Sequence, residues 1–161
     1  MLRTLIIFTL TILSFTASAH GEQEHGDEKQ IKHIIDRIKY GWENGDGKPF
    51  RKHFMDFDGA RYFESGGQNK GLDDLVEHHV EPEKDALVFL ELHFSNIQIH
   101  IEDAMAWAVA DTEVKGKVRK SGKTFDKTGF QTFILKKIQG HWKVLHTHSS
   151  SRNRKPMKAH H

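Results

Sequence analysis

Near its C-terminus the chain reads Gly140-His141-Trp142-Lys143-Val144-Leu145-His146-Thr147-His148-Ser149-Ser150. The pattern is typical of a β-strand, in which successive side chains point to opposite faces of the sheet. We predict a strand that begins in a packed interior and ends with two imidazoles, which either line a pocket or meet solvent at the rim. One face would carry Trp142, Val144, His146 and His148, and the other Lys143, Leu145, Thr147 and Ser149.

The residues before this strand predict three more long strands, over 90–101, 104–118 and 124–138, joined as an antiparallel sheet. In the first of them the alternation slips by one residue at Ser95-Asn96, which predicts a β-bulge in a strongly curved sheet. In the second, alternate alanines form one face, so that a helix or a ligand could approach closely there. The larger side chains, including Trp107, form the other face.

Apolar residues at helical spacing predict helices over residues 28–42, 48–55 and 72–80, with Pro82 ending the third. Adjacent helical residues point about 100° apart, so at most one of His78 and His79 can belong to a site. Helices followed by long strands predict an α+β domain whose helices cover one face of a bent sheet.

The composition and the N-terminus indicate one exported domain. The chain has 161 residues and no cysteine, and its 24 basic and 22 acidic residues nearly balance, which argues against nucleic acid as a partner. Residues 1–19 resemble a cleavable signal peptide, with Arg3, an apolar run and Ala17-Ser18-Ala19. We predict a periplasmic or secreted mature chain from His20, with no membrane segment after cleavage, a flexible lead over 20–27 and a disordered basic tail over 153–161.

Glu64 is the last residue of a short predicted strand at residues 60–64, beside aromatic side chains and just before a turn. If this carboxylate is buried, desolvation raises its pKa and it can act as an acid or base near neutral pH. A solvated glutamate at a strand end is the alternative.

The chain from residue 28 to about 152 resembles the SnoaL-like, nuclear transport factor two-like superfamily, and in pattern most of all the association domain of calcium/calmodulin-dependent kinases. The resemblance rests on Asn44-Gly45-Asp46, Phe63-Glu64, Gly71-Leu72-Asp73 and the closing Gly140–Ser150 segment. It implies a cone-shaped, curved antiparallel sheet wrapped around an N-terminal helix, a cystatin-like α+β barrel, with a pocket inside the cone.

The resemblance also implies roles for single residues. Glu64 falls where the ketosteroid isomerase branch has its proton-abstracting carboxylate. Ile38 stands where that branch has a tyrosine, so the donor that would stabilise an enolate is missing. Ser149 stands where some kinase association domains have an arginine, and Arg61 is a possible substitute.

Three functions remain open from the sequence. The first is binding of a small-molecule ligand in the cone, with Tyr62, Arg61 and Trp107 as binding residues. The second is an isomerase, cyclase or dehydratase with Glu64 and either His146 or His148 as catalytic residues. The third is copper or zinc binding through His20 and His148, although no cofactor is predicted otherwise. The resemblance further implies a homodimer.

Overall fold

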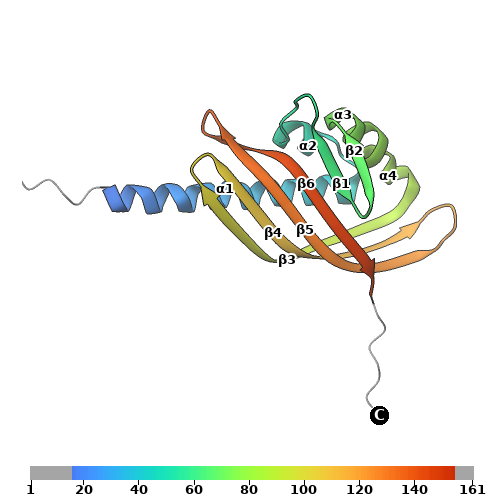
Figure 1. Cartoon of the computed structure of the whole chain (residues 1–161). Helices are drawn as coiled ribbons and strands as arrows, with labels where there is room; N and C mark the ends of the chain where they lie inside the picture. Colours follow the sequence, from blue (N-terminus) through green and yellow to red (C-terminus); the bar gives the residue numbers. More distant parts are fainter. Residues whose placement is uncertain (1–15, 155–161) are drawn as a thin grey trace, which may run out of the picture.

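The computed structural model describes residues 16–154, with side chains from residue 24 onward. It has helices in its first half and long strands in its second, which confirms the predicted α+β class (Figure 1). The elements are α1 (Thr16–Asn44), α2 (Lys48–His53), β1 (Arg61–Glu64), β2 (Gly67–Lys70), α3 (Leu72–Leu75), the π-helical η1 (Val76–Val80), α4 (Glu81–Ala86), β3 (Leu87–Glu102), β4 (Met105–Val118), β5 (Thr124–Ile138) and β6 (His141–Asn153).

The strands form one sheet in the order β2-β1-β6-β5-β4-β3. Neighbouring strands pair antiparallel except β1 and β6, which run parallel, with Phe63 opposite His148 and Glu64 opposite Ser149. The prediction of a wholly antiparallel sheet is therefore wrong at this pair. A parallel neighbour needs a long crossover, and residues 65–140 supply it. The sheet is strongly curved but open, with β2 and β3 at its two edges.

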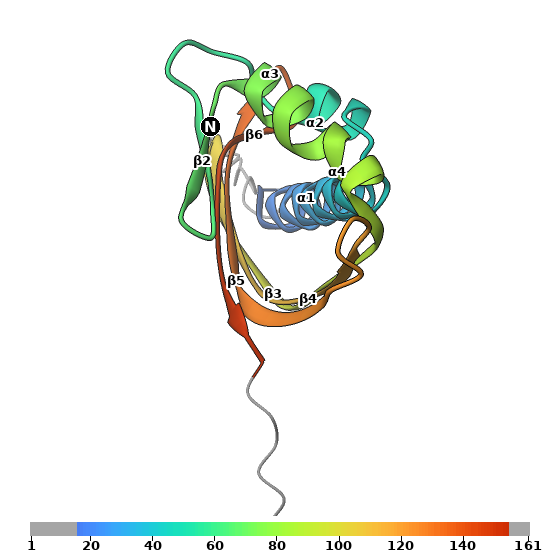
Figure 2. The same cartoon turned by 90° about the vertical axis from the view of Figure 1, so that its right-hand side faces the viewer.

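The curved sheet wraps around α1, and α2 to α4 lie over its open side (Figure 2). Isoleucines at helical spacing bury one face of α1, and alternate alanines of β4 are buried on the inner face of the sheet. Alanine allows the helix axis to come close to the strands, because it projects only a methyl group. The inner face therefore takes the small residues of β4 and the outer face takes its large ones.

The N-terminal helix is longer than the sequence predicts. Residues 20–27 belong to α1, where we expected a flexible lead. Asp27 is buried, accepts a hydrogen bond from Trp142 Nε1 at 3.0 Å, and lies 2.7 Å from Lys137 Nζ. This polar anchor ties the helix to β5 and β6 where the sequence offers no apolar residue. The predicted signal-peptide region from 1 to 15 and the tail beyond residue 154 lie outside the described residues.

Pro82 does not end the third helix. The chain passes from α3 through the π-helical η1 into α4, with Pro82 in the first turn of α4. A proline removes one helical hydrogen bond and its ring crowds the carbonyl four residues earlier. The wider π-helical turn, in which the Glu81 N–H donates to the Val76 carbonyl, accommodates the proline and carries the helix on to Ala86.

Three register shifts interrupt the sheet: one lies at the start of β3, between Leu87 and Phe89, and the other two bear on the sequence predictions. The first of these two lies between Ser95 and Gln98, with Asn96 at a φ of 51°, and confirms the prediction at Ser95-Asn96. The second was not predicted: Val144 pairs with Leu135 and His146 with Ile134, so Leu145 is an extra residue in β6. An extra residue moves every later side chain to the opposite face. The predicted common face of Trp142, Val144, His146 and His148 is therefore wrong beyond Val144.

Candidate active site at the end of β1

A pocket of about 260 Å³ opens between the C-terminal end of α1, the helical segment from η1 to α4, and the sheet. We call it the Glu64 pocket. Two carboxyl groups and one imidazole from separate elements meet there: Glu64 at the end of β1, His79 on η1 and Glu83 on α4. Lys127 of β5 also lines the pocket. Polar groups of β5 and β6, among them Gln131 and Ser149, line the opposite wall.

Glu64 enters this pocket because it ends β1 beside β6. Within β1 the side chains of Tyr62 and Glu64 point inward and those of Arg61 and Phe63 point outward, as strand alternation requires. The side chain of Glu64 is 19% exposed. Burial, with Glu83 as a second cause, raises the pKa of the Glu64 carboxyl to about 8. Of the two alternatives that the sequence left open for Glu64, the structure shows a largely buried carboxyl and not a solvated one.

His79 is the imidazole that faces Glu64. Its Nδ1 lies 3.3 Å from Glu64 Oε2 and 3.2 Å from Asn69 Nδ2, which can only donate a hydrogen bond. Its ring packs edge-on against Trp42, with centroids 5.1 Å apart. Burial lowers the pKa of His79, so the imidazole is neutral near pH 7 and Nδ1 is available as an acceptor.

Glu83 supplies a second carboxyl group to the pocket. Burial raises its pKa to about 7, and its Oε2 is buried with no hydrogen-bond partner among the described residues. Two carboxyl groups in one partly desolvated pocket resist ionising together, since each negative charge disfavours the other. The pair therefore holds a proton at a pH where exposed glutamates are fully ionised.

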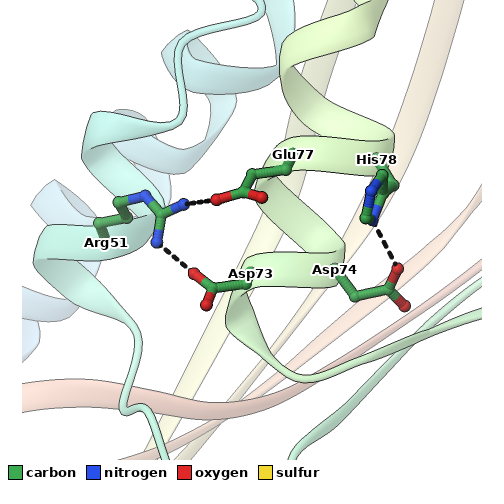
Figure 3. A network of polar contacts seen from close by, with 5 residues as sticks. All are labelled: Arg51, Asp73, Asp74, Glu77 and His78. Atoms are coloured by element: carbon green, nitrogen blue, oxygen red, sulfur yellow. Dashed lines mark hydrogen bonds and ion pairs between the residues drawn. The ribbon is translucent and has the colours of Figure 1, made fainter.

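The structure also decides between the two adjacent histidines. His79 points into the Glu64 pocket, whereas His78 lies on the exposed side of the helix, where its Nδ1 is 3.2 Å from Asp74 (Figure 3). Arg51 of α2 donates to Asp73 at 2.5 Å and to Glu77 at 2.8 Å, which ties α2 to the helix that carries His79 (Figure 3). The sequence-based limit of one site histidine in this pair is confirmed.

Most of the other predicted site residues lie outside the pocket. Tyr62 is fully buried in the core, packs against Phe54, and its hydroxyl is 3.4 Å from the Met55 carbonyl. Trp107 lies on the outer face of the sheet, stacked on His100 with ring centroids 5.0 Å apart. The inner face beside α1 holds the alanines instead, so the large indole is turned outward.

Arg61, His146 and His148 gather around Phe63 on the outer face. The Arg61 side chain lies over the Phe63 ring at 5.2 Å and donates to Gln68. His146 Nδ1 is 2.6 Å from the Arg61 carbonyl, and the two imidazoles contact Phe63 edge-on at 5.1 and 5.8 Å. The bulge at Leu145 causes this placement, and it leaves Thr147 and Ser149 facing inward.

The side chain of His20 is not among those described, and His148 lies on the outer face. From residue 24 to residue 154, no group of three or more His, Cys, Asp or Glu side chains is arranged to hold a metal ion. Copper or zinc binding by His20 and His148 stays a prediction.

Sequence reasoning missed His79 as the partner of Glu64, and it missed Glu83 altogether. The omission of Glu83 follows from the error at Pro82, which was expected to end the helix and leave Glu83 in a loop. His79 lay within the predicted helix, but no pattern in the sequence linked it to Glu64. A helix continued through Pro82 places Glu83 four residues after His79, the spacing at which side chains share a face. The proximity of this face to Glu64 is set by packing between distant segments.

The described part of the chain contains no helix long and apolar enough to cross a bilayer.

Comparison with known proteins gives a consistent result. Residues 31–153 match the sequence model of the SnoaL-like domain. No curated protein sequence matches the chain at a significant level.

Several solved structures share the fold. A nuclear transport factor 2 (NTF2-like) superfamily protein from Salmonella enterica is 18% identical, with a TM-score of 0.70 over 89% of this chain and 99% of that one. The hexachlorocyclohexane dehydrochlorinase LinA type 2 is 14% identical, with a TM-score of 0.72 over 88% and 95%. A Caulobacter vibrioides protein with a cystatin-like fold is 16% identical, with a TM-score of 0.64 over 80% and 91%. At these identities the likeness concerns the fold alone.

Proposed function

Because the chain belongs to the SnoaL-like domain family, we propose that it binds a small organic molecule in the Glu64 pocket and transfers a proton on it. The observation that carries the proposal is the contact of 3.3 Å between a largely buried Glu64 carboxyl and the His79 imidazole. A titratable group is most effective as an acid or base when its pKa lies near the working pH, and burial brings Glu64 to about 8.

Glu64, Glu83 and His79 have different roles. At neutral pH one of the two carboxyl groups keeps its proton, and Glu83, with the pKa nearer 7, ionises more readily than Glu64. His79 Nδ1 lies 3.3 Å from Glu64 Oε2, so the neutral imidazole packs beside the carboxyl and orients it. Asn69 donates to the same nitrogen and fixes the ring.

Elimination fits this set of groups better than isomerisation. Ile38 lines the same small interior cavity as Glu64, and its alkyl side chain offers no donor for an enolate oxygen. In an elimination, Glu64 in its ionised form removes a proton from carbon, the electrons of that C–H bond form the double bond, and the leaving group departs with its own electron pair. The Glu64 carboxyl, protonated by this step, then delivers the proton to the leaving group and is ionised again. LinA, which shares the fold, is named for a dehydrochlorination.

The test uses 5-nitrobenzisoxazole, a general probe that opens when a base removes its ring proton. We expect the full chain to accelerate ring opening, with a rate that rises as pH approaches 8 and Glu64 ionises. The substitution Glu64→Gln keeps the shape of the side chain but removes the base, and we expect it to lower the rate at least about 100-fold.

The matched control is Glu102→Gln, an identical change at an exposed position at the end of β3. This variant should keep the wild-type rate. Equal rates for the wild type and Glu64→Gln at every pH from 6 to 9 would remove Glu64 from the mechanism.

We further propose that two copies pair through the outer face of the sheet. This face exposes four large apolar side chains on adjacent strands, which we call the outer apolar patch. Neighbouring strands β4 and β5 place these residues on the same side of the sheet. Contiguous exposed apolar surface is typical of interaction sites, because burying it is favourable. The patch consists of Met105, Trp107, Val109 and Phe130.

Export is the remaining part of the proposal. It rests on Arg3, the apolar run that follows it and the small residues at 17–19. N-terminal sequencing of protein recovered from outside the cytoplasm should begin at His20.

A further inference from the structure

A second and larger cavity lies away from the Glu64 pocket. It has a volume of about 740 Å³ and runs between the middle of α1, the end of α2 with the loop that follows, and the turn between β5 and β6. It shares no lining residue with the Glu64 pocket. We call it the α1–α2 groove. Its volume lies within the range of sites that hold small organic molecules.

The floor of this groove is apolar. Ile34, Phe54 and Trp142 line it, and each is buried to more than 95%. Ile138 and Met55, which are half-buried, extend the apolar surface toward the mouth. A ligand with an aromatic or alkyl body would therefore remove both its own apolar surface and that of the groove from water.

The rim of the groove is cationic. Lysines reach it from three elements: Lys29 from α1, Lys52 from α2 and Lys143 from β6. Neither Lys29 nor Lys52 forms an ion pair with any residue that the structure describes. Lys143 Nζ donates to the Lys52 carbonyl, which holds its ammonium at the edge. Asp56 is the one carboxylate among the described lining residues.

Three histidines also line this rim, and the pKa of one of them reflects the positive charges around it. His33 and His53 contact edge-on, with centroids 6.1 Å apart, and His141 lies at the β5–β6 turn. Burial, with the charges of Lys52, His33, Lys143 and Arg37 as further causes, lowers the pKa of His53 to about 4. The fixed positive charges of Lys52, Lys143 and Arg37 thus raise the electrostatic potential at one point of the groove.

We propose that the α1–α2 groove is a second binding site, which takes a small organic anion: an acidic head group among Lys29, Lys52 and Lys143, and an apolar body on the floor of Ile34, Phe54 and Trp142. The head group can be a carboxylate, sulfonate or phosphate, because all three accept hydrogen bonds from ammonium groups. A flat anionic surface does not fit as well, since the apolar residues lie at the bottom of a concave site.

The probe is 8-anilinonaphthalene-1-sulfonate, which combines an aromatic body with one negative charge and becomes fluorescent in apolar surroundings. We expect saturable binding of one probe per chain to the folded full chain. The double substitution Lys29→Gln and Lys52→Gln removes two exposed charges and should weaken this binding about tenfold. Thermal melts of each variant confirm that the fold is kept.

The matched control replaces Lys120 and Lys123 with Gln, at the exposed turn between β4 and β5, and should leave the affinity within twofold of the wild type. The substitution Glu64→Gln should also leave it unchanged, because the two cavities share no lining residue. The neutral analogue N-phenyl-1-naphthylamine tests the charge requirement and should bind at least about tenfold more weakly than the sulfonate.

Three results would overturn the proposal: no saturable binding of the sulfonate, equal affinity in the wild type and the Lys29/Lys52 variant, or equal affinity for the neutral analogue. Loss of sulfonate binding in Glu64→Gln would place the probe in the Glu64 pocket and would overturn it as well. None of these results bears on proton transfer by Glu64, so the two proposals fail separately.

Discussion

Glu64 shows how one side chain acquires its chemistry from its surroundings. In an unfolded chain its carboxyl has an ordinary pKa near 4.5, and in the fold burial brings the pKa to about 8. Desolvation disfavours the charged form, because the carboxylate loses water without gaining a full set of hydrogen bonds. The sequence predicts the identity of this residue and its place at a turn, but the loss of water depends on η1, α4 and β6 packing around it.

This shift has a consequence for stability. A carboxyl group whose pKa is raised on folding stabilises the fold fully below about pH 4.5, and this contribution is lost as pH rises through about 8. Below about pH 6.5 the lowered pKa values of His53 and His79 act in the opposite direction, since these histidines must lose a proton on folding. We therefore expect the melting temperature of the wild type to fall between pH 6.5 and pH 9. Each pKa unit corresponds to about 1.4 kcal/mol, and each kcal/mol to about 2–4 °C in a chain of this size.

Thermal unfolding followed by circular dichroism across this pH range checks the prediction. Glu64→Gln should flatten the curve, and the remaining slope belongs to Glu83, whose pKa is also raised. Glu102→Gln should keep the wild-type slope. Parallel curves for the wild type and Glu64→Gln would show that the Glu64 pKa does not change on folding.

At the scale of the element, the bulge at Leu145 decides which side chains of β6 reach the interior. The sequence predicts regular alternation, which places His146 and His148 on the face of Trp142 and Val144. The extra residue reverses this order, so that Thr147 is buried and His148 is exposed. The bulge cannot be recognised from the sequence, because the alternation of apolar and polar residues in this strand is already irregular at Lys143 and Leu145.

Exchanging the two residue types tests this reversal. Thr147→His forces an imidazole into a position that is 6% exposed, and we expect it to destabilise the fold by about 1–3 kcal/mol. His148→Thr alters an exposed position and should change the free energy of unfolding by less than about 0.5 kcal/mol. Urea denaturation measures both. The opposite ranking would mean that β6 continues without a bulge.

The helical segment from α3 to α4 illustrates a second limit of pattern reading at this scale. Proline was expected to stop the helix at Val80, yet η1 absorbs it and brings His79 and Glu83 onto one wall of the pocket. Whether a proline ends a helix depends on whether the backbone can form a wider, π-helical turn before it. Here the buried contacts of Val76 and Val80, rather than the local sequence, stabilise that turn.

At the scale of the whole molecule, the curved sheet has two faces with different tasks. Its inner face packs on α1 and forms the Glu64 pocket at one end, while its outer face exposes the outer apolar patch. If two chains pair through this patch, a charge placed at its centre should separate them, because an unpaired charge in an apolar interface is strongly unfavourable.

We therefore expect Trp107→Glu to convert a dimer into a monomer, as measured by light scattering after size-exclusion chromatography. The control is Val88→Glu, which adds the same charge to an apolar position that is 50% exposed and lies outside the patch. A monomeric wild type at all accessible concentrations, or a Trp107→Glu variant that is still dimeric, would contradict the proposed pairing.

The sequence by itself determined the α+β class, the periods of the helices and long strands, the bulge at Ser95-Asn96 and the carboxylate at Glu64, because these depend on the local spacing of apolar residues and on turn chemistry. Tertiary structure alone decided that Trp107 faces outward, that β1 joins β6 in parallel, and that His79 and Glu83 meet Glu64. These features depend on contacts between residues far apart in the chain, and water is excluded from Glu64 only when those segments have closed around it.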